Sequence, residues 1–355
     1  MRIGFIAPPW LPVPPVGYGG TESVIDRLAR GMQDQGHDVL LFTTGDSTCS
    51  VPRAWVYEET PSVPIGDAVT ELHHLIHGYA ALAACDVVHD HTVVGPLYVA
   101  GRFPDLPVAT TNHGPFNPAM QAIYRASARH VALIAISRSQ AASAGDVPIA
   151  RVIHHGIDVE QVPVGRGDGG YLAFLGRMAP EKGAREAALL ARRAGSRLLM
   201  AAKMNEPAEH AYFDAEVRPH LGGDIEYVGE VGGADKANLL GGATALLNPI
   251  RWPEPFGLVM VEALACGTPV LASPLGAAPE IVEQGVTGLL DWKPDTFASA
   301  VEDVTSLARA DCRRAAERRF TTRRMVDEHL DLFADLVAGG SPARAPDRRE
   351  AISAA

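Results

Sequence analysis

Short apolar runs alternate with longer stretches of helical periodicity along most of this chain of 355 residues. In the first half, strands are expected at 2–7, 38–42, 86–89, 108–111, 131–136 and 151–153, with helices at 22–35 and near 67–84. In the second half, strands are expected at 171–175, 197–201, 224–228, 243–247 and 269–272, with helices near 183–194, 209–218, 235–240 and 256–265. This alternation indicates parallel sheets with helices on both faces, so the predicted fold class is α/β.

One segment, residues 162–170, interrupts the alternation with four glycines and a proline and is the best candidate for a linker. A chain of 355 residues is long enough for two domains that each bury a core. We therefore expect two doubly wound, Rossmann-like domains, at 1–162 and 163–319. Ligands of such sheets bind beyond the carboxyl ends of the strands, so we expect a site in a cleft where the two domains face one another.

The composition argues against several classes of partner and location. A formal net charge of −11 argues against nucleic acid, because neutralising phosphates requires clustered Lys and Arg. No apolar run approaches the length of a membrane span, and the strand pattern begins at residue 2, which leaves no room for a signal peptide. A cytoplasmic location is therefore expected. The four cysteines have no metal-binding spacing and indicate neither a disulfide framework nor a zinc site.

The segment 251–267, RWPEPFGLVMVEALACG, places a carboxylate on a loop just before a predicted helix. Prolines on both sides of Glu254 favour extended backbone, and the apolar run from Phe256 predicts that a helix begins there. Gly257 leaves the first turn without a side chain. The amides of Phe256, Gly257 and Leu258 are then open to an anion such as a diphosphate, which the helix dipole also favours.

A second carboxylate, Glu262, follows Glu254 by eight positions and lies inside the same predicted helix. An ionised carboxylate there can accept hydrogen bonds from two neighbouring hydroxyls, such as those of a ribose. Glutamate is also common in first helical turns for capping and dipole reasons, so a lone pair at this spacing would more often be structural than catalytic.

Two cations follow the strand expected at 171–175, in the string GRMAPEKG at 176–183. Arg177 and Lys182 stand near a helix start, where the dipole disfavours positive charge, so a bound anion best explains them. The alternative is a solvated surface pair.

Two further loops follow strands of the first half. The loop at 8–21 ends in Gly19 and Gly20, whose backbone can wrap closely around a phosphate or a hydroxyl, although glycines that merely permit a turn are the alternative. A dinucleotide fingerprint would need glycine where Glu22 stands. His113 follows the strand at 108–111 and is well placed to form a hydrogen bond with a sugar, although a histidine there would, on its own, more often be structural. The string VHDH at 88–91 has ligand types for a metal, but adjacent strand residues point to opposite faces, so no metal site is predicted.

These segments together resemble one family. The string EPFGLVMVE at 254–262 resembles the Glu-x7-Glu signature of the retaining glycosyltransferases of family 4, which have the GT-B fold, and ALACGTPVLA continues the match. GRMAPEKG resembles the family's Gly-Arg-…-Glu-Lys-Gly element, and the family also has a His-Gly at the position of 113–114. HHGID at 154–158 matches the junction between domains, except that His155 stands where Asn is usual. The resemblance extends to about residue 337.

The resemblance implies roles for particular residues. Arg177 and Lys182 would hold the donor diphosphate in place of a metal and stabilise the leaving group. Glu254 would bind hydroxyls of the donor sugar, Glu262 would bind the ribose, and His113 would orient the sugar or the acceptor. The catalytic set is then His113, Arg177, Lys182 and Glu254. The donor-binding residues, which share contact with the nucleotide sugar, are Gly19, Gly20, Arg177, Lys182, Val228, Gly229, Glu254, Phe256, Gly257, Leu258 and Glu262.

The implied activity is transfer of a hexose-type sugar from a nucleoside diphosphate to a small-molecule or glycan acceptor, with the anomeric configuration retained. A UDP-sugar is favoured over a GDP-sugar, and neither a metal nor a cofactor is expected. No carboxylate is clearly placed as a covalent nucleophile, so same-face displacement is favoured, in which the departing phosphate oxygen takes the acceptor proton. The family also places the last helix, at 320–338, back on the first domain, the acceptor domain. Residues 339–355 are predicted to be a disordered tail.

Alternatives remain at this point. A related GT-B fold serves sugar-nucleotide epimerases and isomerases, and a silent nucleotide-sugar-binding subunit is a third hypothesis. The arginines between 313 and 324 could meet an anionic membrane surface, although a solvated helical face is the preferred interpretation. The acceptor, the sugar and the oligomeric state are not readable from these residues.

Overall fold

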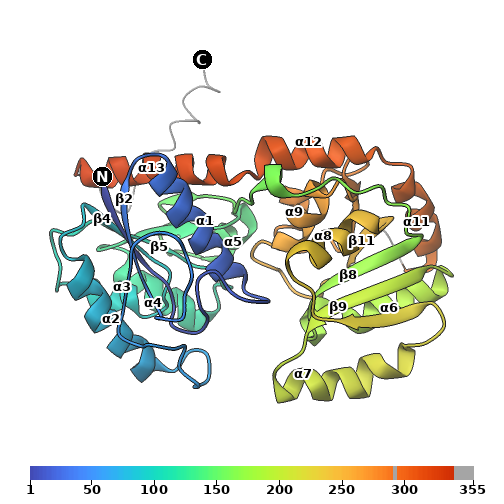
Figure 1. The fold of residues 1–355 in the computed structure, drawn as a ribbon, viewed down its shortest axis with the longest axis horizontal. Coiled ribbons are helices and arrows are strands. Elements are labelled where there is room, and N and C mark those ends of the chain that lie inside the picture. Colours follow the sequence, from blue (N-terminus) through green and yellow to red (C-terminus); the bar gives the residue numbers. More distant parts are fainter. Residues whose placement is uncertain (291–293, 340–355) are drawn as a thin grey trace. The chain divides into compact units, whose positions relative to one another are not determined.

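The computed structural model describes residues 1–290 and 294–339. The chain divides into two compact units (Figure 1). The first comprises Met1–Gly156 together with the segment that starts at Thr322, and the second is Ile157–Thr321. The division falls just before the glycine-rich segment at 162–170 that the sequence marks as a linker. Apart from Gly339, the tail predicted at 339–355 lies outside the described residues.

The first unit contains a seven-stranded parallel sheet with the order β3-β2-β1-β4-β5-β6-β7. The order reverses direction between β1 and β4, which is the switch point where open α/β sheets bind ligands. The strands of this sheet are β1 Arg2–Ile6, β2 Asp38–Thr43, β3 Arg53–Trp55, β4 Val87–Asp90, β5 Val108–Thr111, β6 Ala132–Ala135 and β7 Arg151–Val152. The short edge strand β3 was not predicted.

Six helices of the described residues flank this sheet, and three of them, α3 to α5, were not predicted. Polar side chains begin several: Asp67, Asn117 and Ser137 each accept the amide of the third helical residue, at 2.8–2.9 Å. The last helix packs against α1 and β4 of this unit. The helices are α1 Gly20–Asp34, α2 Ala68–Leu82, α3 Gly95–Val99, α4 Pro118–Ser127, α5 Arg138–Ser143 and α13 Thr322–Val337.

The second unit contains a six-stranded parallel sheet with the order β10-β9-β8-β11-β12-β13. Here the switch point lies between β8 and β11. The strands are β8 Tyr171–Arg177, β9 Arg197–Lys203, β10 Ile225–Gly229, β11 Ala245–Asn248, β12 Val270–Ala272 and β13 Gly288–Leu289. The predicted strand at 171–175 continues to Arg177, and the one at 197–201 continues to Lys203, so both strands end on a cation.

The α-helices of the second unit are α6 Ala184–Arg193, α7 Pro207–Tyr212, α8 Gly233–Gly242, α9 Leu258–Ala265, α10 Ala278–Ile281, α11 Phe297–Thr305 and α12 Arg309–Arg319. The helix predicted at 209–218 is wrong in detail. It consists of α7, a π-helical turn at Phe213–Val217 and a 3₁₀ turn at Arg218–His220. Pro219, which has no amide proton to donate, lies in this 3₁₀ turn, the last helical turn of the segment.

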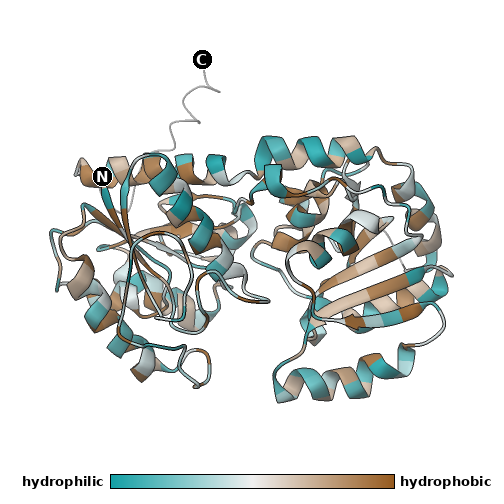
Figure 2. Cartoon of the chain, in the orientation of Figure 1, coloured by the Kyte–Doolittle hydropathy of each residue, from teal (hydrophilic) through white to brown (hydrophobic). Residues whose placement is uncertain are grey.

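The middle of each sheet is largely apolar (Figure 2). Every residue of β4, β5, β6 and β11 is buried, so these strands show no alternation of buried and exposed positions, as is typical of a parallel sheet that is covered on both faces. In the first unit the core includes Ile6, Phe42, Leu75, Tyr79 and Val88. Polar and charged side chains lie mostly at the strand ends and in the loops.

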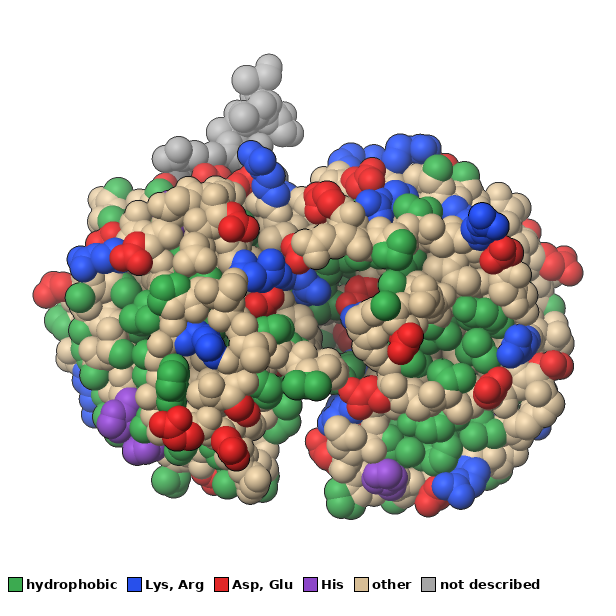
Figure 3. Space-filling model, in the orientation of Figure 1, with side chains coloured by type: hydrophobic (Ala, Val, Ile, Leu, Met, Phe, Trp, Pro, Cys, Tyr) green, Lys and Arg blue, Asp and Glu red, His purple; other side chains and the backbone are tan. Residues whose placement is uncertain are grey.

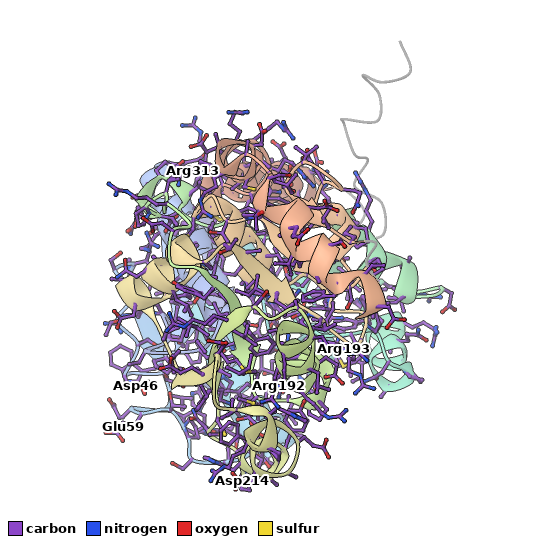
Figure 4. The ribbon with its side chains drawn as sticks, turned by 90° about the vertical axis from the view of Figure 1, so that its right-hand side faces the viewer. Asp46, Glu59, Arg192, Arg193, Asp214 and Arg313 are labelled. Carbon is purple, nitrogen blue, oxygen red and sulfur yellow. The ribbon has the colours of Figure 1, made fainter. Side chains whose placement is uncertain are left out.

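Of the arginines between 313 and 324, Arg314, Arg318 and Arg323 have exposed side chains, as the predicted solvated face requires, whereas Arg313 and Arg324 are largely buried. Arg313 on α12 (Figure 4) donates to the carbonyls of Val162 and Ala265 at 2.7 and 2.9 Å. Arg324 donates to the carbonyls of His154 and His155 at 2.7 and 3.0 Å. Their stems pack while their guanidinium groups satisfy backbone acceptors, which composition alone does not reveal. They hold local structure within their units.

Charge is mixed on the outside. On the face drawn in Figure 3, Lys and Arg side chains lie among Asp and Glu side chains in both units, and no broad basic surface forms there. In the described part of the chain, no helix combines the length and the apolar character that crossing a membrane requires.

Candidate functional site

The loop that carries Glu254 connects β11 to α9 and is held rigidly. The amide of Glu254 donates to the carbonyl of Trp252 at 2.9 Å, and the amide of Ala277 donates to the carbonyl of Glu254 at 3.0 Å. Gly276 has φ 58°, and a Cβ there would lie 2.2 Å from the Glu254 carbonyl oxygen. Only glycine permits this close approach. Glu254 is therefore 9% exposed on a loop with a fixed backbone, as its flanking prolines predicted.

Helix α9 begins at Leu258, two residues later than predicted. Gly257 is its N-cap in the left-handed region, with φ 94°, and a Cβ there would lie 2.6 Å from Cε of Met260. Phe256 is outside the helix and is 3% exposed, with its ring 6.2 Å from that of Phe320. The prediction that the amide of Phe256 belongs to the first helical turn is therefore wrong. The amides without intrahelical partners at this end are those of Leu258 and Val259.

Lys182 and Glu254, which are 72 positions apart, form an ion pair. Each side chain is 12% exposed, and Nζ of Lys182 also lies 5.5 Å from the centre of the Trp252 ring. Lys182 ends a 3₁₀ turn, and the following Gly183 has φ 77° with its Cβ position 2.1 Å from the carbonyl oxygen of Pro249. The loop after β8 and the loop after β11 therefore touch through backbone as well as through this ion pair.

Arg177, the last residue of β8, is paired with carboxylates on two elements. Its Nη2 lies 2.5 Å from Oε1 of Glu181, and its Nε lies 3.8 Å from Oε1 of Glu209. Lys203 is the register partner of Arg177 on β9, and its Nζ lies 3.7 Å from the same Glu209 oxygen. Glu209 is 4% exposed, and its other oxygen accepts the amides of Asn205 and Glu206. Sequence reasoning missed Lys203 and Glu209, although a lysine that ends an apolar strand is a usable signal.

Glu262 lies in α9 and forms an ion pair with Lys236 of α8. Nζ of Lys236 is 2.6 Å from Oε1 of Glu262, and the two side chains are 32% and 17% exposed. Lys236 was not predicted, because it precedes Glu262 by 26 positions and stands on a polar helix without a motif. Val228 and Gly229 end β10, where the register with β9 shifts. Val228 is 38% exposed and Gly229 has φ 88°, so the backbone of this strand end is open.

The charges near the predicted phosphate ligands correct one argument from the sequence. Arg177 and Lys182 were expected to require a bound anion because they stand near a helix start. The structure supplies anions from the protein itself, namely Glu181 for Arg177 and Glu254 for Lys182. A diphosphate bound at these two cations would have to compete with these two carboxylates.

His113 lies in the first unit, just after β5, and is surrounded by other histidines. Its Nε2 is 2.9 Å from Nδ1 of His91, and its ring stacks on that of His155 with centroids 5.3 Å apart. His89 and His91 share one face of the chain at the end of β4, with ring centroids 4.0 Å apart. Burial lowers the pKa of His113 to about 3, so its imidazole is neutral at ordinary pH.

Asp90 points away from these rings. It accepts hydrogen bonds from the Tyr79 hydroxyl at 2.6 Å and from the amide and hydroxyl of Thr92 at 2.8 and 2.7 Å. Adjacent residues of β4 therefore do face opposite sides, as the argument about VHDH assumed. Among the described residues, no three His, Cys, Asp or Glu side chains are grouped so that they could hold a metal ion.

Gly19 and Gly20 stand where the loop after β1 enters α1, in the first unit. Gly19 is the N-cap and Gly20 is the first helical residue. A Cβ on Gly19 would lie 2.6 Å from Cβ of Pro15 and 3.0 Å from Oε2 of Glu22, so the turn has no space for a side chain. Glu22 is 6% exposed, and burial raises its pKa to about 7. The position that rules out a dinucleotide fingerprint therefore carries a buried carboxyl group.

Comparisons with known proteins extend over both units. Residues 18–161 match the family model described as Glycosyltransferase Family 4, and residues 169–306 match the one described as Glycosyl transferases group 1. A phosphatidyl-myo-inositol mannosyltransferase of Mycolicibacterium smegmatis is 28% identical over 322 residues, which are 82% of this chain and 80% of that protein.

Solved structures agree. AviGT4, a glycosyltransferase involved in avilamycin A biosynthesis, is 28% identical with a TM-score of 0.71, over 96% of this chain and 98% of AviGT4. HepE of Anabaena, in a complex with UDP and glucose, is 20% identical with a TM-score of 0.73, over 94% of this chain and 99% of HepE. The predicted fold class is confirmed by these likenesses and by the two parallel sheets. This chain therefore belongs to the family 4 glycosyltransferases and has their GT-B fold.

Proposed function

We propose that this glycosyltransferase moves a sugar from a nucleoside diphosphate to a small-molecule or glycan acceptor, with retention of anomeric configuration and without a metal ion. The observation that carries the proposal is the pairing of both motif carboxylates with lysines in one unit, Lys182 with Glu254 and Lys236 with Glu262. Such alternating charges suit a ligand that has both anionic phosphates and neutral hydroxyls. No observation favours the epimerase or isomerase alternative.

Binding of the donor rearranges these pairs. Arg177, Lys182 and the amides of Leu258 and Val259 receive the diphosphate, which takes the place of carboxylates at the two cations. Glu254, released from Lys182, then accepts hydrogen bonds from hydroxyls of the donor sugar. Glu262 accepts hydrogen bonds from the hydroxyls of the ribose, while Lys236 holds its carboxylate in place. His113 of the first unit contributes a hydrogen bond to the sugar or the acceptor.

The chemical step follows from this placement. The bond between the anomeric carbon and the phosphate oxygen breaks, and its electron pair stays on the phosphate, where Arg177 and Lys182 stabilise the developing charge. The acceptor hydroxyl attacks the anomeric carbon on the same face and transfers its proton to the departing phosphate oxygen. The products are the glycoside and the nucleoside diphosphate. Two cationic side chains supply the charge stabilisation that a divalent metal would otherwise provide.

We propose UDP as the nucleotide of the donor. A structure of the same fold, HepE, holds UDP-glucose. The open backbone at Val228 and Gly229 is suited to pack against a base and to bond its edge. The relatives do not define the acceptor, because a phosphatidyl-inositol mannosyltransferase and an enzyme of avilamycin A biosynthesis are equally similar to this chain.

Calorimetry tests the donor site directly. The protein is titrated with UDP, GDP, ADP and dTDP in the presence of a chelator, and UDP should bind most tightly. Incubation with a UDP-sugar and candidate acceptors, followed by NMR of the anomeric proton, then tests retention. Nucleotide binding that appears only after metal is added, or a glycoside of inverted configuration, would contradict the proposal.

A further inference from the structure

Four buried histidines accompany His113, which is itself half-buried, in the first unit, and they come from four different places in the chain. They are His89, His91, His155 and His329, which lie in β4, directly after β4, after β7 and in α13. The rings touch in sequence: His329 lies 5.1 Å from His89, His89 lies 4.0 Å from His91, His91 lies 5.2 Å from His113, and His113 lies 5.3 Å from His155. Burial lowers the pKa of every member, so the rings are neutral and each carries one proton.

The hydrogen bond between His91 and His113 joins Nδ1 of one ring to Nε2 of the other at 2.9 Å, and two arrangements of protons would satisfy it. In the first, His91 carries its proton on Nδ1 and donates it to Nε2 of His113. In the second, His113 donates, which requires the proton of His91 to sit on Nε2. That second nitrogen of His91 is buried and has no hydrogen-bond partner.

The second arrangement would bury an N–H group that has no acceptor, whereas the first leaves only an unprotonated ring nitrogen that has no donor. A buried N–H group without an acceptor is rarer than a buried acceptor without a donor, and it costs more free energy. His74 shows that this protein buries bare imidazole nitrogens. Its Nε2 lies 3.0 Å from the carbonyl oxygen of Ala7, which can only accept, so its unpartnered Nδ1 has no proton.

We propose that His91 is a positioning residue for His113: it donates its Nδ1–H to Nε2 of His113 and thereby holds the proton of His113 on Nδ1. Nδ1 of His113 makes no hydrogen bond within the described part of the chain and is the nitrogen left for a ligand. His113 then acts as a neutral hydrogen-bond donor, which suits an oxygen of the sugar or the acceptor. The assignment of a sugar or acceptor oxygen as the partner of this N–H group rests on the proposed function, but the tautomer of His113 does not.

His91 is well fixed for this task. It is 4% exposed, its ring stacks on Phe5 at 10° between planes with centroids 6.1 Å apart, and its amide donates to the carbonyl of Ile6 at 3.0 Å. The ring therefore cannot turn to offer Nε2 without leaving its packing. A donor that is held in this way orients its partner before any ligand arrives.

The test is the tautomer of His113 in the unliganded, full-length protein, read by long-range ¹H–¹⁵N NMR after labelling of histidine with ¹⁵N. His113→Gln identifies the signals. Wild-type His113 should carry its proton on Nδ1, and His91→Leu should shift it toward Nε2. His91→Asn places an amide N–H near the position of Nδ1 and should restore the wild-type tautomer. His74 and His329 are internal references, because carbonyls of Ala7 and Met325 hold their protons on Nε2 and Nδ1.

Activity gives a second readout. His91→Leu should lower kcat/KM on the order of tenfold, the loss of one hydrogen bond, and His91→Asn should recover most of it. The affinity for UDP should not change, because none of the proposed nucleotide contacts involves these rings. A proton on Nε2 of His113 in the wild type, or an unchanged tautomer in a folded His91→Leu protein, would overturn the inference. If His91→Leu does not fold, the wild-type tautomer alone decides. Absence of glycosyl transfer would overturn the proposed function and leave the NMR result standing.

Discussion

Replacing Lys182 by methionine tests both interactions proposed for this lysine, the ion pair with the carboxylate of Glu254 and the contact with the diphosphate of the donor. The substitution keeps the apolar stem and removes the charge. Hydrogen bonds to charged groups contribute about 1.5–3 kcal/mol, and about 1.4 kcal/mol corresponds to a tenfold change in affinity. We therefore expect the dissociation constant for UDP to rise on the order of 10- to 100-fold, with no change in the affinity for uridine, which has no phosphate.

The same substitution leaves Glu254 without its cation at a site where both side chains are 12% exposed. An unpaired group of this kind costs about 1–3 kcal/mol of stability, below the 3–5 kcal/mol seen for fully buried pairs. Adding Glu254→Gln to Lys182→Met should recover much of that loss, which gives a coupling energy of about 1 kcal/mol or more in a double-mutant cycle. Glu254→Gln alone should bind UDP severalfold more tightly, because no carboxylate then competes for Lys182, while kcat falls on the order of a hundredfold.

Calorimetry with UDP and uridine, in chelator, measures the binding, and thermal unfolding measures the stability. Arg193→Met is the matched control, since Arg193 is an exposed cation on α6 of the same unit (Figure 4) and should leave both properties unchanged. The reasoning is refuted if Lys182→Met binds UDP as tightly as the wild type does. It is also refuted if the affinity for uridine falls by the same factor as the affinity for UDP.

Three further predictions follow from other contacts. Glu262→Gln should lower the affinity for both UDP and uridine on the order of tenfold, because both ligands contain the ribose that Glu262 would bind. An unchanged affinity for uridine, measured by calorimetry, would exclude the ribose role. Gly276→Ala should lower the melting temperature and abolish turnover, because a Cβ 2.2 Å from the Glu254 carbonyl displaces that loop, whereas Gly195→Ala, with open space around it, provides the control for a positive φ without a clash. Burial lowers the pKa of His329 to about 4, so its stabilising effect is complete above the unfolded pKa of about 6.5 and is lost as the pH falls toward 4, by about 2 kcal/mol at pH 5. The melting temperature of His329→Leu should accordingly fall less between pH 7 and pH 5 than that of the wild type or of the exposed control His130→Leu, and parallel curves would contradict this.

Some features of the fold were readable from local sequence, and others were not. The strand at 108–111 was predicted to the residue because its β-branched residues Val108, Thr110 and Thr111 favour extended backbone and lie between Pro107 and Asn112. The helices α3 and α5 were missed because they have only five and six residues, too few for a periodic pattern. The start of α9 was placed two residues early because Gly257 adopts a left-handed conformation, with φ 94°, and therefore stands outside the helix, which the apolar pattern from Phe256 does not reveal.

The site shows the same division. The sequence by itself determined the α/β class, the two halves and the family, because periodicity, linker composition and short motifs are properties of neighbouring residues. It also named Lys182, Glu254 and Glu262 as candidate site residues. Only the tertiary structure decided which charges meet: Lys182 with Glu254, Lys236 with Glu262, and Lys203 with Glu209 beside Arg177. It likewise brought five histidines from positions 89 to 329 into one row of touching rings. The physical reason is that parallel strands end at one edge of a sheet, so residues far apart in the chain become neighbours there.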